Sequence, residues 1–347
     1  MPEGNEPMMC TDSSRNPTKR TAVSTETHRI RSSYKSILCK NDKERNERKK
    51  MGNTQPTNNT GRKVVIQKLE NAKKTGVLSL SEHNLEACPN QVFEILNLRT
   101  LDLSSNSLRT LNPNIINLQK LKILNLEGNK LMAGTLNSIQ RLSNLQNLNV
   151  GSNSLGETAA AAAVPTKTKT SSKTSVSTSA SKPKNAPASL PPTLPKGLKQ
   201  IKLSSNSLSI MPRAIFTLAK LDKLDLSMNQ IIEIPEEIAN LSSTLTELNL
   251  DFNLLTRLPN GIGSLTKLKT LSLKGNSIAA DKRSQPLPAS LFANTPVIDL
   301  NLHGNPMTSS QLNDMDGFDE YLKRRQRIKT STLLGGALTN LDVCGLD

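Results

Sequence analysis

Aromatic residues are scarce in this sequence. Among its 347 residues there are no Trp, five Phe and two Tyr, so aromatics make up 2% of the chain. A core built around large aromatic side chains is therefore not expected. Apolar runs extend over only a few residues, whereas a helix needs about 20 apolar residues to cross a bilayer. The sequence predicts no transmembrane helix, and its N-terminus lacks the apolar segment of a secretory signal.

Residues suited to catalysis or metal binding are also sparse. The four cysteines are Cys10, Cys39, Cys88 and Cys344. They are far apart and fit neither a disulfide framework nor a zinc site, which indicates a reducing compartment and a cytoplasmic protein. The Gly261-x-Gly263 pair lacks the Lys-Ser/Thr that completes a phosphate-binding loop. We therefore predict no enzymatic activity, no catalytic residues, no metal site, no cofactor and no small-molecule substrate.

The formal net charge of +16 lies mostly in segments without a folding pattern. Residues 1–74 carry 17 Lys and Arg against 8 Asp and Glu, and residues 156–189 carry 5 Lys against 1 Glu. The segments 75–155 and 190–307 are closer to balance, with 18 basic and 14 acidic residues. This distribution argues against a nucleic-acid interface on one basic face of the folded part.

One pattern recurs along the chain: Leu-x-x-Leu-x-Leu-x-x-Asn-x-Leu, as in Leu98-Leu101-Leu103-Asn106-Leu108. Its second apolar position advances by 23 or 24 residues through nine copies, apart from one long step and a last step of 29. That position is occupied by Leu78, Leu101, Leu124, Leu148, Ile201, Leu224, Leu248, Leu271 and Leu300. Such spacing is typical of leucine-rich repeats.

The physics of the pattern predicts the fold. Leu-x-Leu alternates with period two, so each copy forms a short strand with one buried face. Stacked copies bury these Leu side chains together, and each Asn amide pairs with main-chain groups of neighbouring turns. Segments such as Ile234-Pro235-x-x-Ile238 supply apolar residues to the other side. We predict an α/β fold, a leucine-rich-repeat solenoid with a curved parallel sheet on the concave side and short helices or turns on the convex side.

Amphipathic segments flank the repeats and predict helical caps. Lys63–Lys74 has apolar residues at helical spacing, namely Val65, Ile66, Leu69 and Ala72. Ser310–Lys329 has a second apolar stripe, formed by Leu312, Met315, Phe318 and Leu322. The basic run Lys323-Arg324-Arg325 that follows is interpreted as a solvated helix face, with a membrane or nucleic-acid contact as the alternative.

Composition sets the remaining boundaries. Residues 156–189 are rich in Ala, Thr, Ser, Lys and Pro, which cannot pack a core, so they are predicted to be a disordered insert. The predicted segments are a disordered basic arm at 1–62, an N-terminal capping helix at 63–74, repeats one to four at 75–155, the insert at 156–189, repeats five to nine at 190–307, a C-terminal capping helix at 308–330 and a tail at 331–347.

The outward positions of the strands provide the candidate binding surface. They lie between and just after the buried Leu positions, and they are small, polar and of mixed charge, which suits a polar protein partner. The predicted partner-binding residues are Asp102, Asn125, Glu127, Asn149, Lys202, Asp225, Asn249, Asp251, Phe252, Lys274 and His303. Phe252 is read either as an interface hot spot or as a packed turn residue.

The two caps carry a more specific resemblance. Met51-Gly52-Asn53, Leu69–Val77 and Gly317–Leu322 resemble a family of leucine-rich-repeat proteins that begin at Met-Gly-Asn. The resemblance implies no enzymatic activity and N-terminal myristoylation, here of Gly52. Acylation requires translation to start at Met51, and the acylation pattern needs Ser or Thr where this chain has Pro56.

These observations favour a non-catalytic, cytoplasmic, monomeric scaffold or adaptor that binds a protein partner on its concave face. A second hypothesis is a peripheral-membrane adaptor anchored through acylated Gly52, with Lys63, Lys68, Lys73 and Lys74 as an electrostatic second signal. A third is a nucleic-acid-associated protein that acts through its basic disordered segments, although the balanced repeats argue against it.

Overall fold

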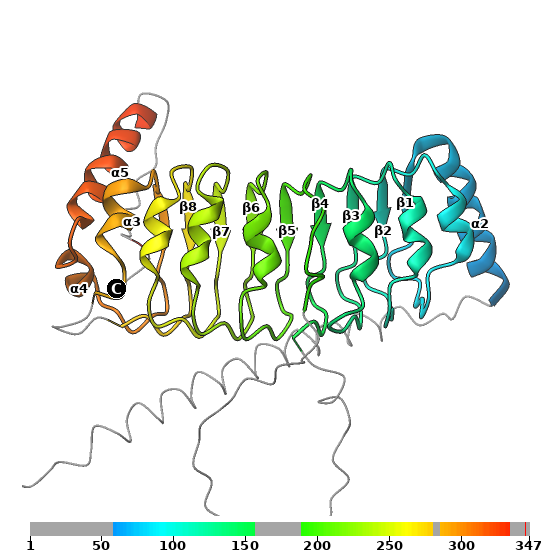
Figure 1. Cartoon of the computed structure of the whole chain (residues 1–347), viewed down its shortest axis with the longest axis horizontal. Coiled ribbons are helices and arrows are strands. Elements are labelled where there is room, and N and C mark those ends of the chain that lie inside the picture. The colour runs from blue at the N-terminus through cyan, green and yellow to red at the C-terminus, as the bar shows by residue number, and fades with distance from the viewer. Residues whose placement is uncertain (1–57, 157–188, 280–284, 334–343, 345–347) are drawn as a thin grey trace, which may run out of the picture. The chain divides into compact units, whose positions relative to one another are not determined.

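The computed structural model describes residues 58–156, 189–279, 285–333 and 344 (Figure 1). Gly52, most of the predicted arm, most of the predicted insert and most of the predicted tail lie outside these residues. From Gly61 onward the described residues pack as one unit. That unit contains the whole repeat array.

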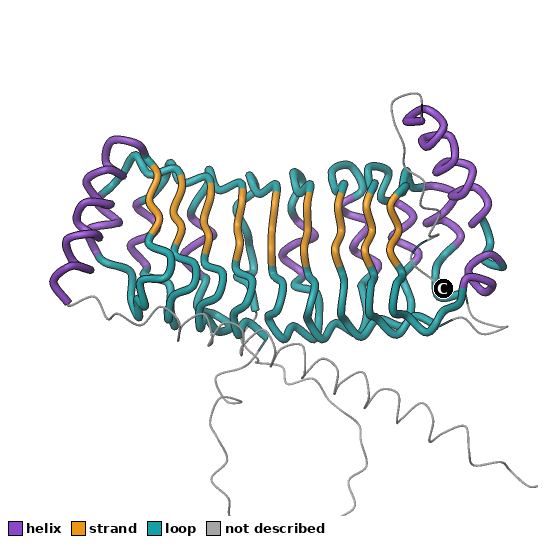
Figure 2. Tube along the Cα trace, turned by 180° about the vertical axis from the view of Figure 1, so that it is seen from behind, coloured by secondary structure: helices purple, strands orange, loops and turns teal. Residues whose placement is uncertain are grey.

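Parallel strands of three residues form one sheet in the described part of the chain, and their spatial order is their chain order. The nine strands are β1 (Val77–Ser79), β2 (Thr100–Asp102), β3 (Ile123–Asn125), β4 (Asn147–Asn149), β5 (Gln200–Lys202), β6 (Lys223–Asp225), β7 (Glu247–Asn249), β8 (Thr270–Ser272) and β9 (Asp299–Asn301). Figure 2 shows them side by side. The predicted solenoid with its parallel sheet is confirmed.

The register follows the apolar pattern. Leu78 pairs with Leu101, and Leu148 pairs directly with Ile201 across the insert. The central residue of every strand is buried, as are the Leu or Val residues of the repeat pattern that flank it. Each fully buried Leu stabilises the fold by roughly 1.5–3 kcal/mol, so a column of aligned Leu residues supplies a large share of the stability.

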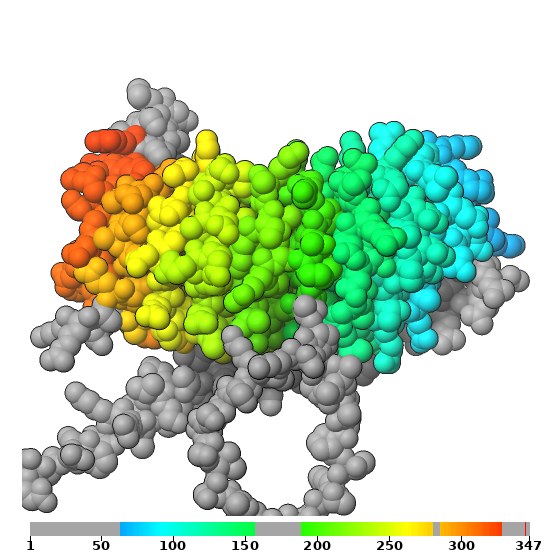
Figure 3. Space-filling model, in the orientation of Figure 1, coloured from blue at the N-terminus to red at the C-terminus, as the bar shows by residue number. Residues whose placement is uncertain are grey.

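Short helices cover the opposite side of the array, where Figure 3 shows one continuous surface. They are η1 (Asn90–Glu94), η2 (Pro113–Asn117), η3 (Asn137–Arg141), η4 (Arg213–Thr217), η5 (Glu236–Leu241), η6 (Asn260–Ser264) and α3 (Ala289–Asn294). A Cβ on Gly261 would lie 2.5 Å from the Glu236 carbonyl oxygen, and one on Gly263 would lie 2.2 Å from Ser290 Oγ. The Gly261-x-Gly263 pair therefore allows close packing between neighbouring turns.

Buried Asn side chains form a ladder beside the ends of the strands. The Nδ2 of Asn129 donates to the carbonyls of Leu103 (3.0 Å) and Leu126 (2.9 Å), and its Oδ1 accepts from the N–H of Leu108 (3.0 Å). The equivalent buried residues are Asn106, Asn153, Asn206, Asn229, Asn253 and Asn276. Each amide joins two neighbouring turns, which is the role that the repeat pattern predicts.

Helix α2 (Asn58–Thr75) packs against the first repeat. Leu69 and Ala72 are buried, and Val65 packs partly against them. Ile66 was predicted to share this stripe, but its side chain is 59% exposed. The reason is geometric, because residues 65, 69 and 72 follow one helix face and Ile66 points about 100° away from Val65.

Two helices, α4 (Ser309–Asn313) and α5 (Phe318–Leu333), replace the single predicted C-terminal cap. Gly317, with φ +80°, separates them and resets the helical phase. Leu312, Met315 and Phe318 are buried as predicted, but Leu322 is 36% exposed and Tyr321 takes its place in the core. The carbonyl of Cys344 accepts a hydrogen bond from Leu302 N–H (2.8 Å), as a next strand would.

The basic run on α5 is not uniformly solvated. Arg324 donates from Nε to the carbonyl of Val297 (2.9 Å) and from both terminal nitrogens to the carbonyl of Phe292 (3.0 Å). Its guanidinium also lies 6.0 Å from the ring centroid of Tyr321. The solvated-face prediction is therefore wrong for Arg324, which fastens the cap to the end of the array.

Candidate protein-binding surface

The strands place most of the predicted partner-binding residues in two parallel rows. The third strand residue carries one row, made up of Asp102, Asn125, Asn149, Lys202, Asp225 and Asn249 from β2 to β7. The position two residues further on carries the other, with Glu127, Asp251, Lys274 and His303. Because the strands are in register, equivalent residues of adjacent repeats are neighbours across the sheet.

A third row was missed by the sequence reasoning. The first residue of each strand also points away from the buried column, and these residues are Val77, Thr100, Ile123, Asn147, Gln200, Lys223, Glu247, Thr270 and Asp299. The same period-two alternation could have found them, because they lie one residue before the central apolar position. This row adds the exposed apolar side chains of Val77 (53%) and Ile123 (41%) to an otherwise polar face.

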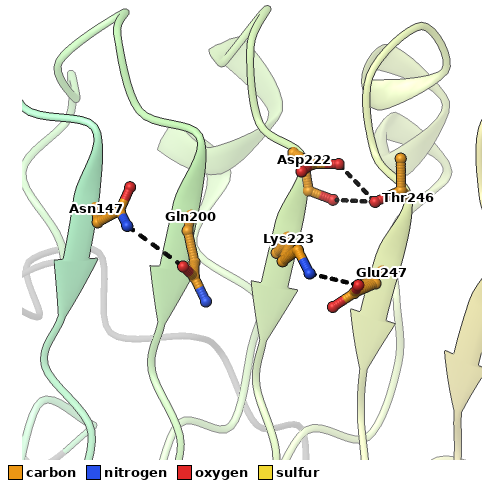
Figure 4. A network of polar contacts seen from close by, with 6 residues as sticks. All are labelled: Asn147, Gln200, Asp222, Lys223, Thr246 and Glu247. Carbon is orange, nitrogen blue, oxygen red and sulfur yellow. Dashed lines mark hydrogen bonds and ion pairs between the residues drawn. The ribbon is translucent and has the colours of Figure 1, made fainter.

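Contacts between adjacent repeats hold four residues of this third row in place (Figure 4). Lys223 on β6 forms an ion pair with Glu247 on β7. Asn147 Nδ2 donates to Gln200 Oε1 across 3.5 Å, and the Thr246 hydroxyl donates to Asp222 Oδ1 just before the strands begin. These contacts fix side-chain directions on a solvent-facing surface.

The other two rows are braced in a similar way. Asp102 Oδ1 accepts from the N–H (3.1 Å) and the hydroxyl (2.7 Å) of Ser104, and Asp225 does the same with Ser227. Asn149 Nδ2 donates to Glu127 Oε2 across 2.9 Å. The side chains are thus oriented before any partner arrives, which lowers the entropic cost of binding.

Asp251 is a half-buried carboxylate of this face. Its Oδ1 accepts from the hydroxyl of Ser272 (2.5 Å) and from the N–H of Lys274 (2.8 Å) in the next repeat. Burial raises the pKa of Asp251 above its usual value, and these two hydrogen bonds act in the opposite direction. Asp251 therefore links two repeats in addition to facing the concave side.

Phe252 occupies the left-handed turn that follows Asp251, with φ +53°. A Cβ on Gly275 would lie 2.5 Å from the Phe252 ring, so the ring rests on the turn of the next repeat. Lys274 Nζ lies 5.6 Å from the ring centroid. These contacts give Phe252 a packing role in the array, and its part in binding stays a prediction.

The other potentially reactive side chains, Cys88, Cys344, His83 and Glu236, are buried or take part in contacts that support the fold. Burial raises the pKa of Cys88 to about 12 and that of Cys344 to about 11, so both thiols stay protonated at neutral pH. His83 replaces the repeat Asn in the first turn, where the main-chain N–H of His83 donates to Asn106 Oδ1 (3.1 Å). Glu236 accepts from the N–H groups of Asn260 and Gly261 and so caps η6.

Among the described residues, no group of His, Cys, Asp or Glu could hold a metal ion. No described helix combines the length and the apolarity needed to cross a membrane. What the repeats present is a polar face with more acidic than basic side chains. The acids in the three rows are Asp102, Glu127, Asp225, Glu247, Asp251 and Asp299, against Lys202, Lys223 and Lys274.

The family model named Leucine Rich Repeat matches two segments of the chain, residues 97–118 and 220–241. Each segment begins one residue before the apolar residue that precedes a strand, Leu98 or Leu221, and ends at or one residue after the end of the following short helix. The fold is a leucine-rich-repeat solenoid. No curated protein sequence matches the chain significantly.

Solved structures similar to this leucine-rich-repeat solenoid come from different organisms. The leucine-rich-repeat protein LIC12759 of Leptospira interrogans is 26% identical with TM-score 0.49, over 71% of this chain and 58% of its own. The ectodomain of the Arabidopsis thaliana receptor kinase GASSHO1/SCHENGEN3, in complex with CASPARIAN STRIP INTEGRITY FACTOR 2, is 26% identical with TM-score 0.48, over 67% and 24%. A TDR receptor is 24% identical with TM-score 0.47, over 67% and 39%. The solenoid thus spans less than two thirds of each of these chains.

Proposed function

We propose that this chain is a non-catalytic adaptor that binds a protein partner on the concave face of its solenoid. The observation that carries the proposal is the set of outward rows, whose polar side chains are oriented by hydrogen bonds within and between repeats. Stacked repeats commonly use such extended faces for binding. A face of this polarity fits a moderately polar protein surface, with Val77 and Ile123 as its apolar contacts.

The test compares two full-length variants that differ only in where the changes lie. Ile123→Asp with Lys202→Glu alters exposed positions of the concave face, and Ile232→Asp with Lys130→Glu makes the same changes at exposed positions away from it. Partners are captured from cells with each variant and quantified by mass spectrometry. We expect the concave variant to lose partners, by about tenfold or more, that the control retains, because hot-spot changes dominate binding energy. Equal capture by both variants, each with a wild-type melt, would overturn the proposal.

A second function is supported by helix α2 and by the resemblance of the caps to leucine-rich repeat-containing protein 57. Val64 (49%) and Ile66 (59%) are exposed on α2, next to the exposed Lys63. A basic helix with exposed apolar residues can rest against an anionic membrane, and one acyl chain needs such a second signal for stable binding. We propose that acylation of Gly52 makes the adaptor a peripheral membrane protein. The intact mass of the protein from its native cells tests this: myristate on Gly52 supports it, and an N-terminus ahead of Met51 excludes it.

A further inference from the structure

Basic side chains line the edge of the solenoid at which the strands begin, the upper edge in Figures 1 and 2. We define this edge by the five residues that precede each of the strands β2 to β9. These segments contain eight Lys and Arg, all exposed: Arg99, Lys120, Lys122, Lys196, Lys199, Lys220, Lys267 and Lys269. Their one acid, Asp222, accepts a hydrogen bond from the hydroxyl of Thr246. We call this set the basic edge.

The opposite edge has no such excess in the part of the chain that the structure describes. Between each repeat Asn and the following short helix, the charged residues are Arg109, Lys130 and Arg257 against Glu86 and Glu233. The concave face between the two edges is acidic. The near balance of charge over the repeats therefore hides a segregation of charge onto separate surfaces of the same unit.

The fold fixes the length of the basic edge, whose charges precede β2, β3, β5, β6 and β8. Neighbouring strands lie about 4.8 Å apart, so the six strand steps from Arg99 before β2 to Lys269 before β8 span about 29 Å. An extended polypeptide advances about 3.3 Å per residue, so about nine residues cover that length. Closely placed like charges repel one another, and an anionic partner relieves the repulsion.

We propose that the basic edge is a second interaction surface, which binds an extended acidic polypeptide segment. Two observations favour a peptide over other polyanions. Proteins that hold single-stranded nucleic acid stack bases on aromatic side chains, and none of the described aromatic residues lies in these segments. Helix α5 extends past this edge in both views, which keeps a flat membrane from lying along the whole row. An acidic peptide needs neither aromatic side chains to stack on nor a flat surface along the whole row, and its charges complement those of the basic edge.

The experiment measures binding of a fluorescein-labelled peptide of twelve Glu residues to the full chain at low salt, by fluorescence anisotropy. One variant changes the basic edge, with Lys122→Glu, Lys199→Glu and Lys269→Glu. A matched variant changes the opposite edge, with Arg109→Glu, Lys130→Glu and Arg257→Glu. All six residues are exposed, and the two variants have the same net charge. Circular-dichroism melts check that both fold.

We expect the basic-edge variant to bind the peptide about tenfold or more weakly and the matched variant to stay within about threefold of wild type. Equal losses in the two variants overturn the proposal, because net charge or the segments outside the repeats would then explain the binding. The absence of binding by the wild-type protein overturns it as well. An oligodeoxythymidine of equal charge and vesicles with phosphatidylserine are measured in parallel. If the oligodeoxythymidine or the vesicles bind more tightly than the peptide, and only the basic-edge variant loses this binding, the assignment to a peptide is overturned. The concave variant Ile123→Asp with Lys202→Glu should keep peptide binding, which separates this inference from the proposed function.

Discussion

Asn129 shows at the scale of one residue why the repeat pattern requires an amide. Its side chain donates to the carbonyls of Leu103 and Leu126, with a longer contact to that of Glu127, and accepts from the N–H of Leu108, so it joins main-chain groups of two adjacent repeats. Asp at this position has no donor for the carbonyls. Leu would leave the Leu108 N–H without its acceptor, and the Leu103 and Leu126 carbonyls would keep only their other donors, Asn106 Nδ2 and Asn153 Nδ2. The side chain is only 8% exposed, so water cannot take over these hydrogen bonds.

Replacing Asn129 by Ala should therefore lower the free energy of unfolding by roughly 1–3 kcal/mol, because the buried Leu108 N–H loses its acceptor and the Leu103 and Leu126 carbonyls each lose one of two Asn donors. Asn117→Ala provides the control, since Asn117 is exposed at the end of η2. A surface change of this kind usually stays within about 0.5 kcal/mol. Urea denaturation of both variants measures the difference, and an Asn129→Ala curve that overlays that of Asn117→Ala would contradict the assigned role.

At the scale of the element, the apolar spacing predicts the array well and the caps less well. The strands, their register and the buried column all follow from Leu residues that recur every 23 or 24 positions, because each repeat meets the same environment. A cap has no such repetition, and its packing depends on which helix face meets the last turn. Helical spacing alone therefore misassigned Ile66 and Leu322.

The C-terminal cap also shows which contacts sequence periodicity cannot supply. Gly317 breaks the predicted helix in two, so Tyr321 instead of Leu322 enters the core beside Phe292 and Phe318. Arg324 then reaches main-chain carbonyls 27 and 32 residues away along the chain. Such contacts between distant segments depend on the assembled fold, which local pattern does not encode.

In the candidate binding surface, too, sequence periodicity predicts which residues face outward but not which contacts they make. Ten of the eleven predicted residues lie at outward repeat positions, which alternation alone assigns. The link from Asp251 to Ser272 and Lys274 and the ring of Phe252 against Gly275 depend on contacts across repeats. Counting basic and acidic residues over the whole repeat segment likewise could not predict the basic edge, because the fold determines on which surface each Lys lies.

At the scale of the whole molecule, the insert interrupts the sequence but not the sheet. Asn147 and Gln200 are 53 positions apart in the chain, yet β4 and β5 pair in the same register as every other neighbouring pair. Main-chain contacts continue through this junction, since Gly156 N–H donates to the carbonyl of Asn206 (2.8 Å). The Leu155 N–H also donates to Asn206 Oδ1 across 3.3 Å, as equivalent groups do in other repeats.

Replacing residues 157–188 with Gly-Ser-Gly would restore a step of 24 residues between Leu148 and Ile201, matching the longer of the ordinary steps. We expect the shortened protein to melt in one cooperative transition, because β4 and β5 keep their contacts. Shorter loops cost less closure entropy, by about 0.6 kcal/mol for each halving, so stability should stay equal or rise by up to about 2 kcal/mol. Calorimetry of the two proteins measures this. Two separate transitions in the shortened protein would mean that the halves of the array are not coupled through β4 and β5, and the nine-strand solenoid would then have to be redrawn as two.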